Sequence, residues 1–266
     1  MHSNLLAQQN SHARDDRISF YEPTHTYTID DSPSRLYTSV TTFNHGLFKP
    51  FDADTVIDKM MKGKNWKPGH KYWGLNKQSI LDMWETNRDE AARAGTKLHN
   101  DIECFYNGSP GNNTSIEYQY FMNFVKDFPD VNERPYRTEW TIFHEELRMA
   151  GSVDMIFENP EDNGDTLIIY DWKRSREINK VNHWNVFSEI ECISHIPDSN
   201  YWHYCLQLNT YKAIIESKYQ KRVSGMYLVC LHPDNKNGNY QRIRVADLQS
   251  EVSQLFNLRR HQLATF

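Results

Sequence analysis

Apolar residues recur along the chain with two spacings, which distinguish expected helices from expected strands. Spacings of three and four residues predict helices over residues 77–107, 115–128, 201–219 and from 247 onward. Alternating or unbroken apolar runs predict strands over residues 134–147, 151–158, 166–173, 224–232 and 240–245. A short hairpin over 18–29 and a helical entry segment over 35–62 precede them. We therefore expect an α/β fold with a central mixed sheet flanked by helices.

The composition suits a compact domain. The 266 residues are 38% hydrophobic and 13% aromatic, enough for a sizeable core in one large domain or in one domain with a small appendage. No stretch approaches the ~20 apolar residues of a membrane span, and Met1 to Arg17 lacks the apolar centre of a signal peptide. We expect a soluble intracellular protein whose compartment the sequence does not identify.

The cysteines give no sign of a disulfide framework or a zinc site. They are widely separated and show no Cys-x-x-Cys spacing; their positions are Cys104, Cys192, Cys205 and Cys230. We expect reduced thiols in the core.

Two carboxylates occupy similar positions on neighbouring expected strands. Asp154 follows Gly151-Ser152-Val153, and Asp171 ends the apolar run 166–170. Phosphodiester hydrolysis is served by a hard divalent cation, which takes oxygen ligands, often from one or two carboxylates. Lys173 lies two residues beyond Asp171 and therefore on the same face of the strand. The pattern predicts a metal-dependent phosphodiesterase site that opens at the edge of the sheet.

Three roles are open to Lys173. Its ammonium could orient the attacking water, stabilise charge developing on phosphorus, or act as a base if its pKa is lowered. The side chain of Trp172 should point the other way, into the core, since neighbouring residues in a strand alternate. The Trp172 carbonyl lies between the two catalytic side chains and is a candidate further metal ligand.

An Asp-x-Lys sequence at a strand end is usually a solvated edge or an exposed ion pair, so the hypothesis needs further elements. His99 and Glu103 lie four residues apart on one face of an expected helix, and Gln207 and Tyr211 share that spacing. Each pair alone is more often structural than functional. Combined with the two strands, they form a specific set.

The order of these motifs resembles the RecB-like branch of the PD-(D/E)XK nucleases. The matching stretches are Gly-Thr-x-Leu-His-x-x-Ile-Glu over 95–103, Gly-Ser-Val-Asp, Asp-Trp-Lys-Arg-Ser and Gln-Leu-Asn-Thr-Tyr. Ser39-Val40-Thr41-Thr42, after His25-x-Tyr27, is similar to the amino-terminal segment of small single-domain exonucleases such as the mitochondrial genome maintenance exonuclease. The resemblance implies a restriction-endonuclease-like core.

The resemblance also implies roles for individual residues. His99, Asp154, Asp171 and the Trp172 carbonyl would form the metal shell for one or two Mg²⁺ or Mn²⁺ ions, with Lys173 as the catalytic lysine. Gln207 with Tyr211 would position the phosphate backbone, and Glu103 and Glu139 are weaker candidates. Some relatives carry an iron–sulfur cluster held by tightly spaced cysteines, a pattern from which this chain departs, so no cluster is expected.

Local charge favours nucleic acid, although the formal net charge is −5. Between Lys59 and Lys77 there are six lysines, no acidic residue and three large aromatics, a composition suited to phosphate contacts and base stacking. The alternative is a solvated loop that its aromatics anchor to the core. The DNA-binding candidates are Lys62, Lys64, Trp66 and Lys67 in this segment, and Arg174, Ser175 and Arg176 beyond the catalytic strand.

Residues 177–200 show no clear period and are expected to form a substrate-facing insertion. Trp184, Phe187 and Trp202 are expected to pack this insertion onto the core, because aromatics dominate buried contacts. Base stacking is the alternative for these three side chains.

We expect a Mg²⁺- or Mn²⁺-dependent DNA exonuclease that prefers single strands and acts in replication, recombination or repair. Residues 1–76 would form a helical and basic segment packed on the core, a candidate DNA-guiding arch, and residues 77–266 the nuclease core. The alternatives are a flap or junction endonuclease and a non-catalytic DNA-binding recombination subunit; the intact motif residues argue against the latter. No helicase phosphate-binding loop is present, so a helicase or recombinase would be a separate partner.

Overall fold

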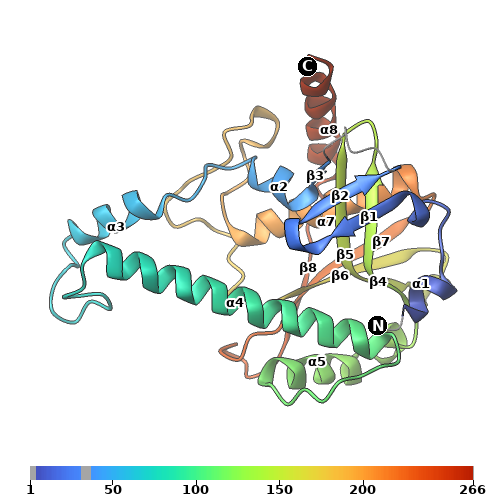
Figure 1. The fold of residues 1–266 in the computed structure, drawn as a ribbon, viewed down its shortest axis with the longest axis horizontal. Coiled ribbons are helices and arrows are strands. Elements are labelled where there is room, and N and C mark those ends of the chain that lie inside the picture. Colours follow the sequence, from blue (N-terminus) through green and yellow to red (C-terminus); the bar gives the residue numbers. More distant parts are fainter. Residues whose placement is uncertain (1–3, 31–36, 266) are drawn as a thin grey trace.

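The computed structural model describes residues 4–30 and 37–265; residues 1–3, 31–36 and 266, which include the start of the expected 35–62 segment, lie outside the described part. A mixed sheet forms the centre (Figure 1). In the described residues its order is β3-β5-β6-β7-β8, with β4 also paired to β5. The strands are β3 (Thr38–Ser39), β4 (Pro135–His144), β5 (Met149–Glu158), β6 (Leu167–Lys173), β7 (Val223–Cys230) and β8 (Gln241–Arg244).

Strand directions confirm the expected mixed sheet. The pairs β4–β5, β5–β6 and β7–β8 are antiparallel, whereas β6–β7 and β3–β5 are parallel. The unbroken apolar run of β6 follows from its central position, because both of its faces are buried. Ile169 packs in one hydrophobic cluster, and Ile168, Tyr170 and Trp172 pack in another.

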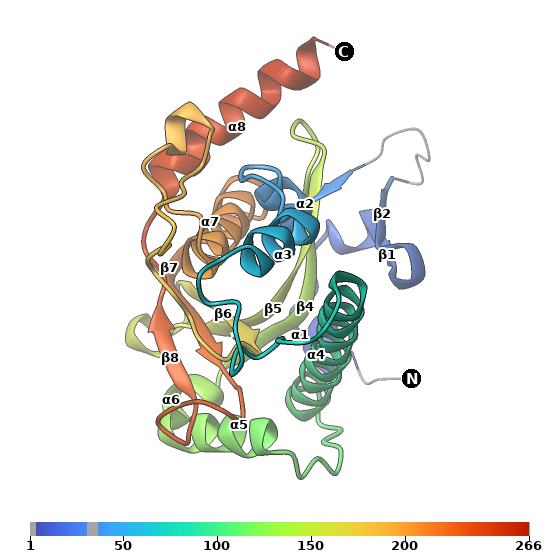
Figure 2. The same ribbon diagram turned by 90° about the vertical axis from the view of Figure 1, so that its left-hand side faces the viewer.

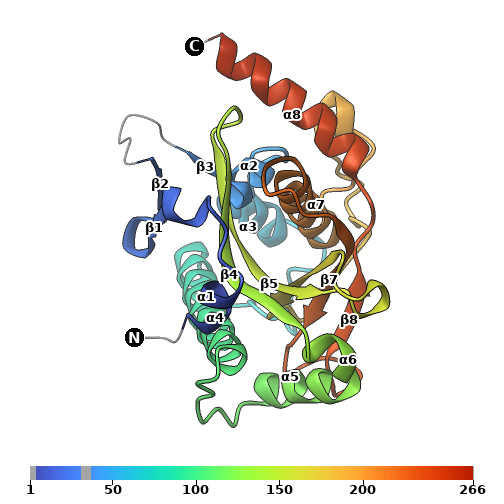
Figure 3. The same cartoon turned by 90° about the vertical axis from the view of Figure 1, so that its right-hand side faces the viewer.

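Helices cover both faces of the sheet (Figures 2 and 3). One hydrophobic cluster joins the sheet to α2 (Val40–His45), α7 (Asn200–Lys218) and α8 (Gln249–Ala264). The other joins it to α1 (Leu5–Gln9), α4 (Lys77–Tyr106), α5 (Ile116–Asp127) and α6 (Pro129–Asn132). Figure 3 shows the curved β4–β5 hairpin between α4 and α7. None of the helices in the described part is long and apolar enough to cross a membrane.

Helix α4 reaches beyond the sheet, and α3 (Ala53–Met61) packs near its amino-terminal end (Figure 1). We call α3, the loop 62–76 and the first half of α4 the arm. The cap of α4 is Asn76, whose side chain accepts a hydrogen bond from the Ser79 amide. Aromatic rings of the loop pack on one another and on α4, as in the pairs Trp66–Trp73 and Tyr72–Trp84. The loop therefore has aromatic contacts of its own.

The amino-terminal residues lie against β4. The expected hairpin over 18–29 is present as β1 (Ile18–Tyr21) and β2 (Thr26–Ile29), which are antiparallel. The expected 35–62 segment contains helices α2 and α3, but it also supplies β3 to the central sheet. The first 76 residues thus contribute to the sheet as well as to the arm.

The turn between β4 and β5 comes earlier than its expected position at 148–150. It ends at Arg148, which has a positive φ of 47°, and β5 begins at Met149. Gly151, expected to start the strand, lies inside it. A Cβ at Gly151 would come within 2.7 Å of Tyr211 Cε1, so glycine is required here by close packing rather than by a turn.

Candidate metal centre

The candidate residues gather where β5 and β6 separate. The β5–β6 pairing runs from Glu158↔Leu167 to Met155↔Tyr170 and stops there, one position before Asp154 and Asp171. Strand β6 continues beside β7 as far as Lys173. The two carboxylates therefore lie in a fork between neighbouring strands. Since β6 is flanked by β5 and β7, Asp171 and Lys173 lie at the carboxyl end of a central strand and not on an edge strand. That the site opens at the edge of the sheet stays a prediction.

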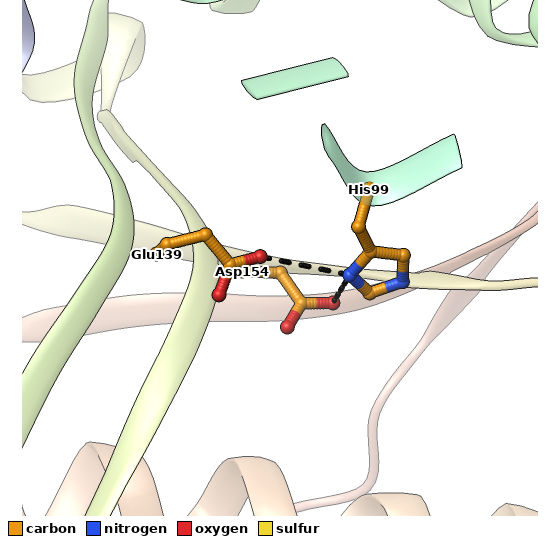
Figure 4. A group of neighbouring side chains, drawn as sticks. All are labelled: His99, Glu139 and Asp154. Carbon is orange, nitrogen blue, oxygen red and sulfur yellow. Dashed lines mark ion pairs between the residues drawn. The ribbon is translucent and has the colours of Figure 1, made fainter. Parts of the chain in front are cut away.

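His99, on α4, faces two carboxylates in this fork (Figure 4). Its Nδ1 lies 3.6 Å from Glu139 Oε1 and 3.6 Å from Asp154 Oδ2. Its Nε2 lies 2.9 Å from the Trp172 carbonyl oxygen. Because a carbonyl only accepts hydrogen bonds, Nε2 carries a proton and donates it to this contact. This orientation directs Nδ1 to the carboxylates, as an outer partner does for metal-binding histidines.

Glu139 is held by an unusual backbone conformation. Its φ is 42°, a left-handed value that costs a non-glycine residue about 1–3 kcal/mol. The flanking pairs Thr138↔Met155 and Trp140↔Val153 place Glu139 opposite Asp154. Ser152 Oγ donates to Glu139 Oε2 at 2.8 Å. Glu139, a weaker candidate from sequence, thus joins His99 and Asp154 in a group whose ligand atoms all lie within 4.8 Å of one another.

Asp154 and Asp171 are both buried carboxylates. Asp154 Oδ2 accepts a hydrogen bond from the Trp172 amide at 3.0 Å. Burial raises the pKa of Asp154, against the opposing effects of His99 and Lys173. Burial likewise raises the pKa of Asp171 to about 6, although Lys173 favours its charged form. Both groups are therefore poised to gain from a nearby cation.

Lys173 is paired with Asp171 through a contact of 2.6 Å between Nζ and Oδ2. Burial lowers the pKa of Lys173, but the Asp171 and Asp154 carboxylates outweigh it and raise the pKa above its ordinary value. Lys173 is therefore an ammonium in this structure. Its three expected roles stay predictions, because a cation held by the same carboxylates would weaken the effect that raises this pKa.

The charge on His99 depends on the same carboxylates. Burial lowers its pKa, whereas Asp154 and Glu139 raise it more, to about 9. A protonated imidazole thus partly balances the acidic group, and a divalent cation would compete with that proton. Carboxylate oxygens and an imidazole nitrogen form a donor set that suits Mn²⁺ and, through its oxygens, Mg²⁺. The expected role of the Trp172 carbonyl as a direct ligand stays a prediction; here it orients His99.

Gln207 and Tyr211 approach the fork from α7. Gln207 Nε2 donates to the Tyr211 hydroxyl at 3.1 Å and lies 3.5 Å from Thr41 Oγ1. Tyr211 is 3% exposed and packs over Gly151. Tyr211 is buried, and its hydroxyl holds the Gln207 side chain in place. Gln207 is half-buried and is the more accessible of the two.

The remaining sequence candidates lie outside this cluster. Arg174 is half-buried and its Nε is 2.8 Å from Glu117 Oε1 of α5, and Ser175 Oγ donates to the Glu177 carbonyl. Glu103 lies one helical turn beyond His99 and is not part of the three-residue group. Four basic candidates are exposed: Lys62, Lys64, Lys67 and Arg176. Trp66 is half-buried against His70 and Trp73.

The aromatics between residues 184 and 204 follow the expectations from sequence only in part. Trp184 is 88% exposed, so the expectation that it packs the insertion onto the core was wrong. Trp202 does pack against the core, and its Nε1 donates to the Lys180 carbonyl. Tyr204 was not identified from sequence, yet its ring centroid lies 4.8 Å from Lys173 Nζ. Its position three residues before Gln207, on the same helix face, was the available signal.

The chain matches no known protein-family model, and no curated protein matches it.

Proposed function

We propose that this protein is a Mg²⁺- or Mn²⁺-dependent deoxyribonuclease with a restriction-endonuclease-like core, related to the RecB-like branch of the PD-(D/E)XK nucleases. The observation that carries the proposal is the cluster in the fork between β5 and β6. There His99, Glu139 and Asp154 converge within 4.8 Å, and the Asp171–Lys173 pair follows on β6. Fixed carboxylates with an adjacent ammonium suit phosphodiester hydrolysis.

Each residue of the fork has a distinct role in this proposal. Asp154 and Asp171, with Glu139 and His99 Nδ1, would hold the cation. When bound, the cation would supply Lewis-acid chemistry, neutralising phosphoryl oxygens and lowering the pKa of a water. The Trp172 backbone keeps Asp154 and His99 oriented through its amide and its carbonyl. Lys173, held beside Asp171, would stabilise negative charge on the phosphoryl group.

The proposed substrate is DNA, preferentially single-stranded and degraded from an end. Exposed cations on the arm at Lys62, Lys64 and Lys67, and Arg176 just beyond β6, support this choice, because cations along a path can follow a phosphate backbone. The exposed indole of Trp184 offers a surface for base stacking. Such an activity would serve DNA replication, recombination or repair, with any helicase or recombinase as a separate protein.

Cleavage of end-labelled single-stranded, duplex and covalently closed circular DNA tests the proposal. Reactions contain Mg²⁺, Mn²⁺ or EDTA, and compare the wild type with Asp171→Asn. We expect metal-dependent loss of linear single strands, sparing of circles, and no cleavage by the variant. Asp165→Asn is the matched control, because Asp165 is an exposed carboxylate just before β6.

Other outcomes would identify the alternatives. Nicked circles would indicate an endonuclease. DNA binding without cleavage at any metal concentration would contradict the proposal and favour a non-catalytic DNA-binding subunit. Equal loss of activity in Asp171→Asn and Asp165→Asn would mean that the fork is not the centre of the reaction.

A further inference from the structure

Helix α7 presents a row of side chains to the fork. Tyr204, Gln207 and Tyr211 are spaced by three and four residues and therefore share one helix face. Cys205 and Leu206, on other sides of the helix, are buried in the core cluster. Tyr204 is the member of the row nearest the amino-terminal end of α7, and it faces Lys173.

The Lys173 ammonium lies between a carboxylate and an aromatic ring. Nζ is 2.6 Å from Asp171 Oδ2 and 4.8 Å from the Tyr204 ring centroid. The Lys173 side chain is only 17% exposed, so few waters can take the place of either contact. A cation this close to the face of a ring is attracted by the ring quadrupole, and the attraction grows with desolvation.

We propose that Tyr204 is a positioning residue that holds the Lys173 ammonium in the fork through the face of its ring. Lysine has a long flexible side chain, and restraining it costs conformational entropy that a contact must offset. A ring can supply this restraint without a net charge. A second carboxylate in its place would add repulsion toward a phosphate, whereas the neutral ring adds none.

The inference rests on the proposed nuclease function for its kinetic part, but the contact can be measured separately. Lysine labelled with ¹³C at the ε-carbon reports ring currents by NMR, and Lys173→Arg identifies the signal of Lys173. We expect an upfield-shifted signal that remains in Tyr204→Phe and moves to the ordinary lysine position in Tyr204→Leu. An unchanged signal in Tyr204→Leu would overturn the inference whether or not the protein cleaves DNA.

Steady-state kinetics on single-stranded DNA test the catalytic consequence. Tyr204→Leu should lower kcat by about 10- to 30-fold while KM changes by less than about twofold, because the ring acts on Lys173 and not on the substrate. Tyr204→Phe keeps the ring and should retain nearly full activity. A rise in KM instead of a fall in kcat, or equal loss in the Phe and Leu variants, would contradict the positioning role.

The same helix provides a matched control. Tyr201 has a similar contact, 4.6 Å from Lys180 Nζ, but not with Lys173. If Tyr204 acted only by packing α7, Tyr201→Leu would lower kcat at least as much, because Tyr201 is more deeply buried. Equal kcat losses in folded Tyr201→Leu and Tyr204→Leu would overturn the inference. An inactive wild type that still shows the shifted lysine signal would instead refute the nuclease proposal, and with it the catalytic role of the contact.

Discussion

Backbone groups orient the side chains of the candidate metal centre. The amide and the carbonyl of Trp172 contact Asp154 and His99, which come from a strand and from a helix. The Trp172 indole is buried in the cluster on the α4 and α5 side of the sheet, so core packing fixes the peptide that orients the site. Glu139 likewise depends on backbone conformation, through its positive φ.

Replacing Glu139 by glutamine tests whether it contributes to metal binding. The change removes one negative charge but keeps an oxygen that can accept the hydrogen bond from Ser152. We expect Mn²⁺ affinity, measured by calorimetry, to fall roughly 10- to 100-fold. Glu103→Gln is the control, since Glu103 lies outside the three-residue group. Unchanged affinity in Glu139→Gln would restrict the centre to the aspartates and His99.

The raised pKa of His99 predicts that metal binding depends on pH. Burial lowers this pKa, but Asp154 and Glu139 raise it to about 9, so the imidazole is protonated at neutral pH. A cation that binds at Nδ1 must displace this proton. Mn²⁺ affinity should therefore increase by about tenfold per pH unit between pH 7 and 8.5. His99→Asn should flatten this slope, and a flat slope in the wild type would contradict the role of His99 as a ligand.

At the scale of elements, most helices and strands could be predicted from the sequence. The point at which β5 and β6 separate could not. The expected helices over 77–107 and 115–128 are confirmed as α4 and α5, because their apolar spacing is long and regular. The fork arises where β5 leaves β6, and local periodicity carries no information about where pairing stops. The position of Glu139 depends on the same long-range register, which explains why it was only a weaker candidate.

Exposure was the second property that the sequence did not reveal. Trp184 and Trp202 were both expected to pack on the core, yet only Trp202 does so. Arg174 and Arg176 are both basic candidates beyond β6, but Arg174 is paired with Glu117 while Arg176 is exposed. Tertiary partners decide such cases, and a linear pattern cannot rank them.

The arm predicts a salt dependence that can be measured. Lys62, Lys64 and Lys67 are exposed, whereas Lys77 is paired with Asp54 and Asp58. Replacing the three exposed lysines by alanine should weaken binding to single-stranded DNA and reduce the slope of log K against log salt by roughly 0.7 for each phosphate that the variant no longer neutralises. The control replaces Lys218, whose contact is with Glu146 at the β4–β5 turn. A slope identical to that of the wild type would exclude the arm from the DNA path.

At the scale of the whole molecule, the amino-terminal segment is tied to the strand that carries Glu139. Asp15 Oδ2 lies 2.7 Å from Arg137 Nη1, and Oδ1 accepts from Trp140 Nε1 at 2.9 Å. Arg137 and Trp140 are buried on β4, with exposed fractions of 6% and 0%. They lie on either side of Glu139, the residue with the positive φ. A segment distant in sequence thus stabilises the part of β4 from which the candidate ligand projects.

Asp15→Asn should lower the free energy of unfolding by about 1–3 kcal/mol, because it leaves the buried Arg137 guanidinium without its charged partner. Burial raises the pKa of Asp15, but hydrogen bonds from Arg137 and Trp140 outweigh it and lower that pKa below 3.8. A lowered folded-state pKa means that the carboxylate stabilises the protein above its ordinary pKa, and that this contribution is lost as pH falls through the folded value. In urea unfolding, the wild type and the variant should therefore differ in free energy of unfolding by a constant amount from pH 5 to 8. This difference should shrink below about pH 4. The control is Asp16→Asn, because Asp16 is exposed, and this variant should have the free energy of unfolding of the wild type. Equal destabilisation by the two variants would mean that Asp15 does not tie the amino-terminal segment to β4.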